Sequence, residues 1–407
     1  MSIFCKITSV LWDYSYIHLE NPIMVFRPAF LLLAQQVVLL LVTIQYYNSI
    51  RDRGNLYRQA VVFPQHSAWQ HLYDNADDTS FLLMTGVSRD VFHMLLNILY
   101  PHRKVDSAGR LRGRPRSLLP HAELGLFLFF ISSTMNIKHL CLIFGSVPSV
   151  CSRSLTKLLK LIPRKLGNHP FAKIEFPSQE KMTTWAKMIQ QREPIAHDVI
   201  GFMDGLSLHS ECSPDTFEQN AMYNGYHSDT MVNNVFAYGA DGTVFLCALN
   251  FVGSAHDGSL VANLLPTIRN RIGLFKICVD QGFPRTGDAD GILVGPYSKR
   301  SAASLAPILR EHLLRLSNSY VSLRQASEWG MRGLQGSFPR FKRCLPSDRI
   351  KRWRIIQSIV HVHNFRTHVI GCNQINRVFD PEYETVIKLN GNDRISRYYY
   401  YSSTNHV

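Results

Sequence analysis

Two apolar runs, each closed by an aspartate and a glycine, constrain the fold of this chain more than any other feature. Residues 199–205 read VIGFMDG, and residues 276–282 read KICVDQG. Short apolar runs bounded by turn residues are typical of buried strands. An aspartate at the end of such a strand lies at the edge of the sheet, where functional sites collect. The two runs therefore predict a sheet that presents Asp204 and Asp280 at one edge.

A third carboxylate, Glu328, lies in a later segment with the pattern of a helix. Carboxylates that converge on one point repel one another unless a cation lies between them, and oxygen ligands of this kind suit Mg²⁺ or Mn²⁺. The pattern predicts a two-metal site for phosphoryl transfer, in which Asp204 bridges the metals and Asp280 and Glu328 each complete one coordination shell. Taken singly, an Asp-Gly pair is an ordinary turn and Glu328 is a solvated helix charge. Only the combination favours the site.

The charge of the chain indicates a polyanionic partner. Its 407 residues carry a formal net charge of +14, and 46% of them are apolar, enough for well-formed cores. Nucleic acid is the usual partner for such a balance, and an acidic membrane surface is the alternative. Basic residues gather at 332–354 and at 103–116, where Arg112-Gly113-Arg114-Pro115 is similar to the core of an AT-hook. The alternative for both stretches is a solvated loop or helix face.

A helical, helix-turn-helix-like domain is expected at residues 79–166. Apolar residues recur there at three- and four-residue spacing, as on the core face of a helix. Residues 136–144 predict a helix, 145–148 a turn, and 149–159 a second helix with Ser149, Ser152, Arg153 and Lys157 on its exposed face. This layout is that of a helix-turn-helix, whose second helix enters a major groove. A plain helical hairpin is the alternative.

The segment after Asp204 completes the predicted sheet. Residues 233–238 and 243–249 predict two strands joined by an Asp-Gly hairpin, and a helix is expected at 259–271. Further helices are expected at 301–315 and from 319 onward. Antiparallel strands followed by a helix and a strand with an acid at its end give the order of an α/β, RNase H-like mixed sheet.

The N-terminal region contains a long apolar run. Residues 28–50 include no charged side chain, and the helix expected at 30–47 could nearly cross the hydrocarbon core of a bilayer. Gln35 and Gln36 would then lie near the bilayer centre without partners, so we expect a helix buried against the protein rather than a membrane anchor. The predicted domains are 1–60 (apolar helix region), 79–166 (helical domain), 167–196 (connector), 197–370 (catalytic domain) and 371–407 (tail).

Several short blocks, taken in order, resemble those of PIF/Harbinger-type DDE transposases and the nucleases derived from them. The blocks are Met203-Asp204-Gly205, Gly253-Ser254-Ala255-His256-Asp257, Asp280-Gln281-Gly282-Phe283-Pro284, Gly295-Pro296-Tyr297, Glu328 with Leu334, Gly336 and Phe338, and His363-Asn364-Phe365. The resemblance covers residues 199–364. It departs from the family pattern at 285–291, which look inserted, and at Trp329-Gly330 after the glutamate.

The resemblance implies a metal-dependent DNA endonuclease or transposase with an RNase H-like core. Asp204, Asp280 and Glu328 match the catalytic acids, and Asp257 matches a position regarded as a metal ligand; capping a helix is its alternative role. The implied cofactor is Mg²⁺ or Mn²⁺, and the implied partner is DNA. A separate Myb-like DNA-binding protein and a homo-oligomer are further expectations, and the expected location is the nucleus, with the cytoplasm as a second site. A domesticated DNA-binding protein with vestigial acids is the alternative function.

Overall fold

The computed structural model describes residues 26–51, 56–101, 117–297, 303, 306–371, 373–383 and 385. The AT-hook-like stretch at 103–116 lies outside these residues. The chain divides into two compact units, residues 1–56 and 57–407.

In the first unit, the described residues 26–51 form one long helix, α2 (Phe26–Arg51). Within this unit, the side chains described there, residues 32–44, are mostly exposed, and the expectation that the helix packs against the rest of the protein stays a prediction. Leu33 is 60% exposed and Leu39 is 69% exposed. Apolar residues follow one another without a break from Val37 to Val42, so they point in every direction around the helix axis. A helix of this kind has no single stripe that packing on one side would cover.

The second unit begins with a group of helices that enclose an aromatic core around Trp69. Their bounds are α3 (Ala68–Asn75), α4 (Asp78–Thr85), α5 (Arg89–Leu99), α6 (Pro120–Ile131), α7 (Ile137–Phe144) and α8 (Pro148–Leu166), preceded by 3-10 turns at Arg58–Ala60 and Pro64–His66. The helical pattern from residue 79 to 99 is broken at Gly86, whose φ of +75° ends α4, and Ser88 caps the start of α5. Within the described residues no single helix has the length and apolar composition of a membrane span, although the bent pair α4 and α5 meets that test together.

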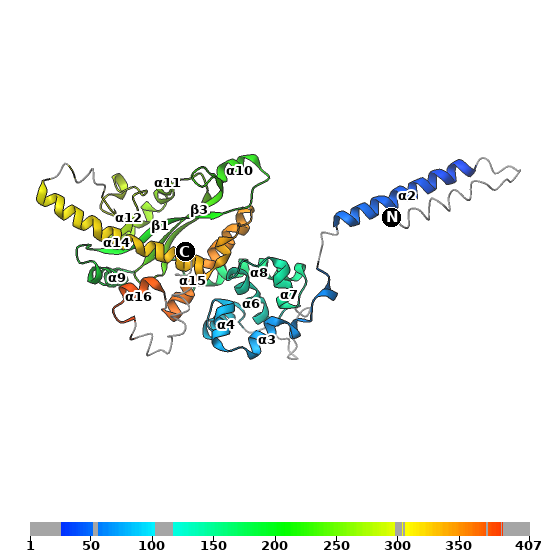
Figure 1. Ribbon diagram of the computed structural model, residues 1–407, viewed down its shortest axis with the longest axis horizontal. Coiled ribbons are helices and arrows are strands. Elements are labelled where there is room, and N and C mark those ends of the chain that lie inside the picture. The colour runs from blue at the N-terminus through cyan, green and yellow to red at the C-terminus, as the bar shows by residue number, and fades with distance from the viewer. Residues whose placement is uncertain are drawn as a thin grey trace. The chain divides into compact units, whose positions relative to one another are not determined.

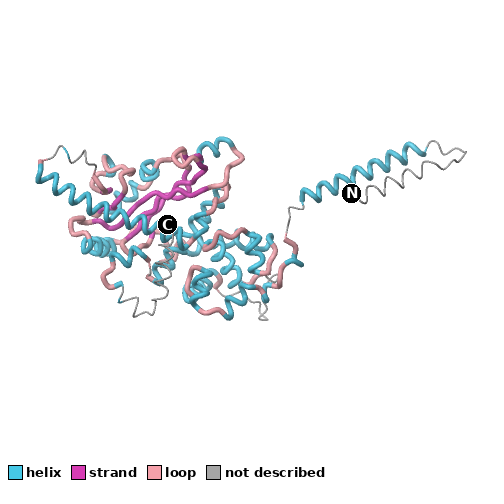
Figure 2. The backbone as a smooth tube through the Cα atoms, in the orientation of Figure 1, coloured by secondary structure: helices cyan, strands magenta, loops and turns pink. Residues whose placement is uncertain are grey.

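A mixed sheet forms the centre of the second unit. Its strands are β1 (Val199–His209), β2 (Tyr223–Asn224), β3 (Asp229–Gly239), β4 (Val244–Val252), β5 (Lys276–Val279) and β6 (Leu293–Val294). They lie in the order β2-β3-β1-β5-β6, with β4 paired to β3 (Figure 2). β1 is antiparallel to β3 and parallel to β5. The predicted hairpin between residues 233 and 249 is confirmed, and Gly242 takes the left-handed conformation of its turn with φ +79°.

Two long helices cover opposite faces of the sheet (Figure 1). A Cβ on Gly239 would lie 2.4 Å from the Trp185 ring of α9 (Gln179–Arg192), and the Tyr238 ring lies against Gly330 of α14 (Pro307–Ser337). Successive residues of a strand point to opposite faces, so α9 and α14 enclose β3 from both sides. The remaining elements are α10 (Thr216–Met222), α11 (Asp257–Ala262), α12 (Leu265–Ile272), α15 (Arg349–Ile370), α16 (Gln374–Phe379) and 3-10 turns at Gly287–Ala289 and Pro339–Lys342.

Three predicted helices have different bounds in the structure. The helix expected at 259–271 is divided into α11 and α12, because Pro266 stands in the first turn of α12 and starts a new helix there. The helices expected at 301–315 and from 319 onward are one helix in the structure, α14, from Pro307 to Ser337.

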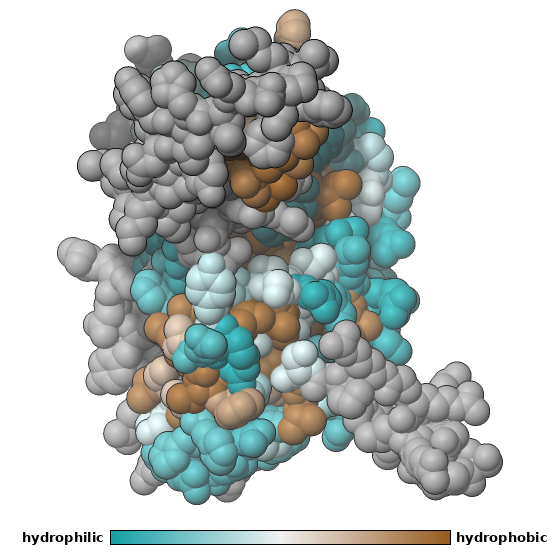
Figure 3. Space-filling view, turned by 90° about the vertical axis from the view of Figure 1, so that its right-hand side faces the viewer, coloured by the Kyte–Doolittle hydropathy of each residue, from teal (hydrophilic) through white to brown (hydrophobic). Residues whose placement is uncertain are grey.

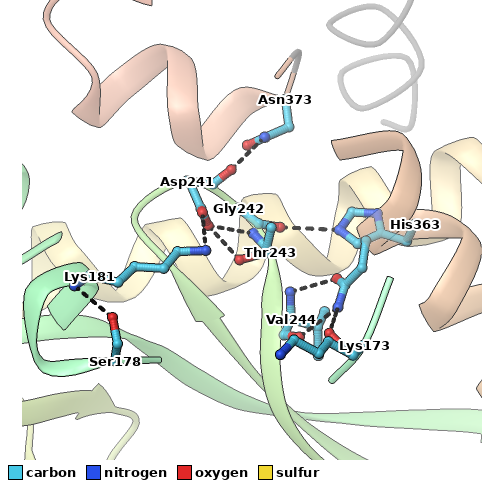
Figure 4. A network of polar contacts seen from close by, with 10 residues as sticks. Lys173, Ser178, Lys181, Asp241, Gly242, Thr243, Val244, His363 and Asn373 are labelled. Carbon is cyan, nitrogen blue, oxygen red and sulfur yellow. Dashed lines mark hydrogen bonds and ion pairs between the residues drawn. The ribbon is translucent and has the colours of Figure 1, made fainter. Parts of the chain in front are cut away.

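A network of polar contacts holds the β3–β4 hairpin against three helices (Figure 4). The hairpin lies at the opposite end of the sheet from Asp280. Asn364 of α15 accepts a hydrogen bond from the Val244 amide at 2.8 Å and donates one to the Val244 carbonyl at 2.8 Å. Lys181 of α9 pairs with Asp241 at 3.0 Å, and Asn373, which caps α16, donates to the Asp241 carbonyl at 2.8 Å. These contacts account for Asn364 as a structural residue.

Candidate active site

Asp204 lies in the central strand of the sheet. The prediction that it ends its strand is wrong, because β1 continues to His209. Leu206 and Leu208 alternate with polar residues after it, and β3 pairs with this part of β1 as far as His209. However, the parallel pairing of β1 with β5 stops at Met203. Asp204 is therefore the first residue beyond the parallel ladder, at the edge where β5 has ended.

Asp280 occupies the matching position on the neighbouring strand. Val279, the last residue of β5, pairs with Met203 of β1, and Asp280 follows directly. Because β1 and β5 run parallel, Asp204 and Asp280 lie at the same end of the β1–β5 ladder, although β1 itself continues beside β3. The predicted placement of Asp280 after a buried strand is confirmed.

Glu328 reaches this region from α14, as its helical pattern predicted. Its neighbour Ser327 is fully buried, and the Ser327 hydroxyl lies 3.4 Å from Oδ2 of Asp204. Close packing of α14 on the sheet depends on Gly330, where a Cβ would lie 2.8 Å from the Tyr238 ring. The glycine after Trp329, a departure from the family pattern, thus has a packing reason.

Arg324 connects the acids of the strand and the helix. Its Nη2 lies 3.1 Å from Oε1 of Glu328, and its Nε lies 3.7 Å from Oδ1 of Asp280. Arg332, one turn beyond Glu328, places Nη2 3.9 Å from the other carboxylate oxygen, Oε2. The sequence-based reasoning missed Arg324. Its spacing of four residues before Glu328 was a usable signal, because residues i and i+4 of a helix are neighbours.

Asp257 is the first residue of α11, and His256 takes the N-cap position. His256 rather than Asp257 thus occupies the position that the capping alternative requires, and the role of Asp257 as a metal ligand stays a prediction, since the structure does not describe its side chain. The backbone before it is tied to β3, where the Asn233 amide donates to the carbonyls of Gly253 at 3.1 Å and Ala255 at 2.8 Å.

Carboxylate oxygens are ligands that suit a hard divalent cation. The carboxylates of Asp280, directly after β5, and of Glu328 in α14 lie close to one shared positive group, the Arg324 guanidinium. Among the side chains that the structure describes, which leave out that of Asp257, no group of three or more His, Cys, Asp or Glu side chains is close enough to hold a metal ion. Asp280 and Glu328 are thus brought together through Arg324, whereas Asp204 meets α14 through Ser327.

The charged groups of the site also affect the pKa values of two side chains inside the sheet. Burial raises the pKa of the Tyr238 phenol, and the charge of nearby Asp204 raises it further. Burial also raises the pKa of the Cys278 thiol to about 12, while the Arg324 and Arg285 cations oppose that shift. Both groups are uncharged at neutral pH, so the carboxylates and arginines are the charges that matter here.

The segment that looked inserted, 285–291, packs back onto the rim of the sheet. Arg285 donates from Nη1 to the Pro296 carbonyl at 2.6 Å, and its guanidinium lies 6.0 Å from the Tyr297 ring centre. Asp288, in a 3-10 turn, pairs with Arg269 of α12 at 3.0 Å. The segment is therefore a folded loop beside Asp280.

A basic groove of about 660 Å³ runs along α8, the second helix of the predicted helix-turn-helix. Its charged lining comprises Arg153, Lys157, Lys160 and Arg164, which share one face of the helix. Lys157, expected on the exposed face, pairs with the buried Glu123 and lies 4.9 Å from the Tyr100 ring centre. Arg153, Lys160 and Arg164 are exposed.

The basic segment 332–354 divides into outward and inward side chains. Arg352 is only 2% exposed, and its Nε donates to Asn250 at 2.6 Å. Arg340 stacks on the Phe130 ring at 4.0 Å and donates to the Met135 carbonyl at 3.2 Å. The expectation of phosphate contact is wrong for the buried Arg352, and Arg340 is engaged in packing. The exposed members are Arg332, Lys342, Arg343, Arg349 and Lys351.

Comparison with known protein families finds a match over the stretch that contains the candidate site. No curated protein and no solved structure matches the chain. Residues 203–364, less than half of the chain, match the family of DDE superfamily endonucleases. The matched stretch begins beside Asp204, ends at Asn364 and includes Asp280 and Glu328, so the part of this chain that carries the candidate site is similar to a DDE superfamily endonuclease.

Proposed function

We propose that this protein is a divalent-metal-dependent DNA endonuclease or transposase of the DDE type. One observation carries the proposal: Asp204 and Asp280 directly follow the last residue pair of the parallel β1–β5 ladder, and Arg324 links Asp280 to Glu328 of α14. All of these residues lie within the stretch that is similar to DDE superfamily endonucleases. A family of endonucleases that act on DNA also implies DNA as the substrate.

The finer assignments rest on topology and on short motifs. The strand order β4-β3-β1-β5-β6, antiparallel on one side of β1 and parallel on the other, supports an RNase H-like core. The pair α7 and α8, joined through Gly145 in the left-handed conformation, supports a helix-turn-helix. The sequence blocks from Met203 to Phe365 support the PIF/Harbinger subtype.

The roles of the residues follow from their positions. Asp204, Asp280 and Glu328 would hold Mg²⁺ or Mn²⁺, with Asp257 as a further ligand. When bound, the metal ions activate an oxygen nucleophile and stabilise the leaving oxygen of a phosphodiester. Ser327 orients Asp204 from the helix side, and Gly330 keeps α14 close enough to the sheet for Glu328 to face Asp280. The exposed arginines and lysines of α8 and of the segment 332–354 bind the DNA backbone.

Two basic surfaces support DNA as the partner, the α8 groove and the outward side chains between 332 and 354. A protein that acts on chromosomal DNA works in the nucleus, which we propose as its location, with the cytoplasm as a second site. A separate Myb-like DNA-binding protein and a second copy of this chain are the further partners that we propose.

The alternative is a domesticated DNA-binding protein whose acids no longer hold a metal. The contacts of Arg324 and Arg332 with Glu328 favour it, because arginines that neutralise the acids permanently would leave a folded but inactive site. Strand cleavage in Mn²⁺ separates the two functions.

The decisive experiment is an Asp280→Asn substitution. We expect it to abolish Mn²⁺-dependent cleavage of duplex DNA while leaving the DNA affinity measured without divalent metal nearly unchanged, because it keeps the shape of the side chain and removes the charge that holds the metal. Asp288→Asn is the matched control, since Asp288 lies on the next loop and is exposed. An Asp280→Asn protein that cleaves at the wild-type rate would show that Asp280 is not a ligand.

A further inference from the structure

We propose that Arg324 couples metal binding to DNA binding. Its guanidinium serves as the counter-ion of Asp280 and Glu328 until a divalent cation takes these carboxylates, and it then binds a phosphate of the DNA backbone. The inference rests on the proposed function, because it takes the two carboxylates as metal ligands.

The first step is geometric. Arg324 contacts both acids, at 3.1 Å from Glu328 and 3.7 Å from Asp280. The three side chains are 31%, 36% and 42% exposed, for Arg324, Glu328 and Asp280 respectively. A cation from solvent can therefore approach the two carboxylates, and the arginine has room to swing outward.

Arg324 and a divalent cation compete for the same carboxylate oxygens. An arginine is charged at every pH of interest, so it cannot leave the carboxylates by losing its proton. It leaves only when another cation replaces it. A divalent ion carries twice the charge and approaches carboxylate oxygens to about 2.1 Å, closer than a guanidinium does. The arginine thus lowers the apparent metal affinity without preventing metal binding.

Arg324 becomes available to DNA once the metal ion has displaced it from the two carboxylates. Arg324 and Arg332 lie one turn before and one turn after Glu328 on α14. Once a metal ion neutralises the two carboxylates, their negative charge no longer balances that of Arg324 and Arg332. Both arginines are then cations available to phosphate, beside the place where the phosphodiester is expected. Guanidinium groups bind phosphate with two parallel hydrogen bonds. Metal should therefore tighten DNA binding, and DNA must tighten metal binding by the same factor.

If Arg324 has a purely structural role, its removal should change the Mn²⁺ affinity in the opposite direction. If the arginine only holds the end of β5 against α14, its removal lets the carboxylates drift apart and weakens metal binding. If it competes with the metal, its removal strengthens metal binding. The sign of the change in Mn²⁺ affinity therefore distinguishes the two roles.

The test is calorimetric titration of the full chain with Mn²⁺, in the presence and absence of a short DNA duplex of arbitrary sequence. Without DNA, we expect Arg324→Gln to bind Mn²⁺ about two- to tenfold more tightly than wild type, the range for one or two half-exposed ion pairs. In wild type, DNA should raise the Mn²⁺ affinity at least about fivefold, and in Arg324→Gln the increase should be clearly smaller.

Two further substitutions make the test specific. Arg315→Gln removes the same kind of i,i+4 pair from α14, with Glu311, at a position 67% exposed; it should leave Mn²⁺ binding unchanged. Arg324→Lys keeps a positive charge without the two-pronged guanidinium, and its Mn²⁺ affinity should lie between those of wild type and Arg324→Gln. Thermal unfolding of each variant checks that it is folded.

The outcomes separate this inference from the proposed function. Weaker or unchanged Mn²⁺ binding by a folded Arg324→Gln protein would overturn the coupling role while leaving the nuclease intact. So would an equal effect of DNA on the Mn²⁺ affinity of both proteins. If Asp280→Asn binds Mn²⁺ as tightly as wild type, the proposed metal site itself is wrong, and the inference fails with it.

Discussion

At the scale of single residues, small or buried side chains determine how the acids are held. Gly330 lets α14 contact the Tyr238 ring, and Ser327, three residues before it, touches Asp204. Buried Arg352 donates to Asn250, Ser210 and the Pro346 carbonyl, which replace the water that it loses. These residues lie outside the set of acids, yet the position of Glu328 depends on some of them.

We expect Gly330→Ala to destabilise the protein by about 1–3 kcal/mol, because the added methyl group would lie 2.8 Å from the Tyr238 ring and force α14 outward. Gly333→Ala is the control, since no atom lies within 4 Å of its added Cβ. There the change should stabilise α14 by about 0.5–1 kcal/mol through helix propensity. Urea unfolding of both variants measures the difference, and equal effects would contradict the packing argument.

His363 should make the protein sensitive to acid. Burial and the nearby Arg366 cation lower the pKa of its imidazole from 6.5 to about 3. Between these two values the unfolded chain binds a proton that the folded chain does not, so the free energy of unfolding falls as the pH drops below 6.5 and levels off near pH 3. The fall attributable to this group approaches about 1.4 kcal/mol per pH unit.

Urea unfolding at pH 7, 6 and 5 tests this expectation against His363→Gln, which can still donate to the Gly242 carbonyl that His363 contacts at 3.1 Å. The variant should lose less stability on acidification than wild type. His66→Gln, at an exposed position, should follow wild type. Parallel curves for wild type and His363→Gln would show that this histidine does not titrate on unfolding.

At the scale of elements, α8 and α14 combine structural and binding roles. One side of α8 buries Leu155, Leu158 and Ile162, and the other carries the basic groove. Lys157 lies between these sides and forms an ion pair with Glu123, so less of its positive charge is available to bind DNA than that of its neighbours. The helix can therefore present exposed arginines to DNA from a fixed position.

Replacing Arg153 and Arg164 together by Gln should weaken DNA binding and make it less sensitive to salt. Each lost phosphate contact lowers the steepness of the log–log salt dependence by about 0.9. The control is the pair Lys187→Gln and Arg192→Gln on α9, which removes the same charge from exposed positions elsewhere in the fold. Equal changes in slope for the two double variants would mean that α8 contributes only net charge.

At the scale of the whole molecule, the two compact units differ in how they use apolar residues. The second unit buries them in the sheet and the aromatic cluster. On the face shown in Figure 3, apolar residues at the surface are interspersed with polar ones. In the first unit, the apolar side chains between Leu32 and Ile44 are largely exposed. Contiguous exposed apolar surface promotes association.

We therefore expect the full chain to self-associate and a chain that begins at Tyr57 to remain folded, monodisperse and able to cleave DNA. The second unit has its own core, whereas the first contributes one exposed helix. Light scattering after size exclusion compares the two chains, and thermal unfolding compares their stabilities. An insoluble or unfolded truncation would show that α2 covers apolar surface of the second unit.

The sequence by itself determined the local elements and the identity of the acids. The apolar runs before Asp204 and Asp280 predicted two buried strands, and residues 136–159 predicted a helical pair; both depend on periodicity and turn residues that act over a few positions. Continuous helical patterns concealed the breaks at Gly86 and Pro266, since tertiary packing selects among locally similar conformations.

Only the tertiary structure decided which charges meet. Arg324 reaches Asp280 because α14 packs against β1 and β5, and that packing depends on contact between Gly330 and Tyr238, which are far apart in the sequence. Likewise, Arg352 faces inward and Arg349 outward in one basic segment, because only the former meets Asn250 and the carbonyls around it. Such pairings depend on long-range contacts, for which a pattern along the chain holds no local signal.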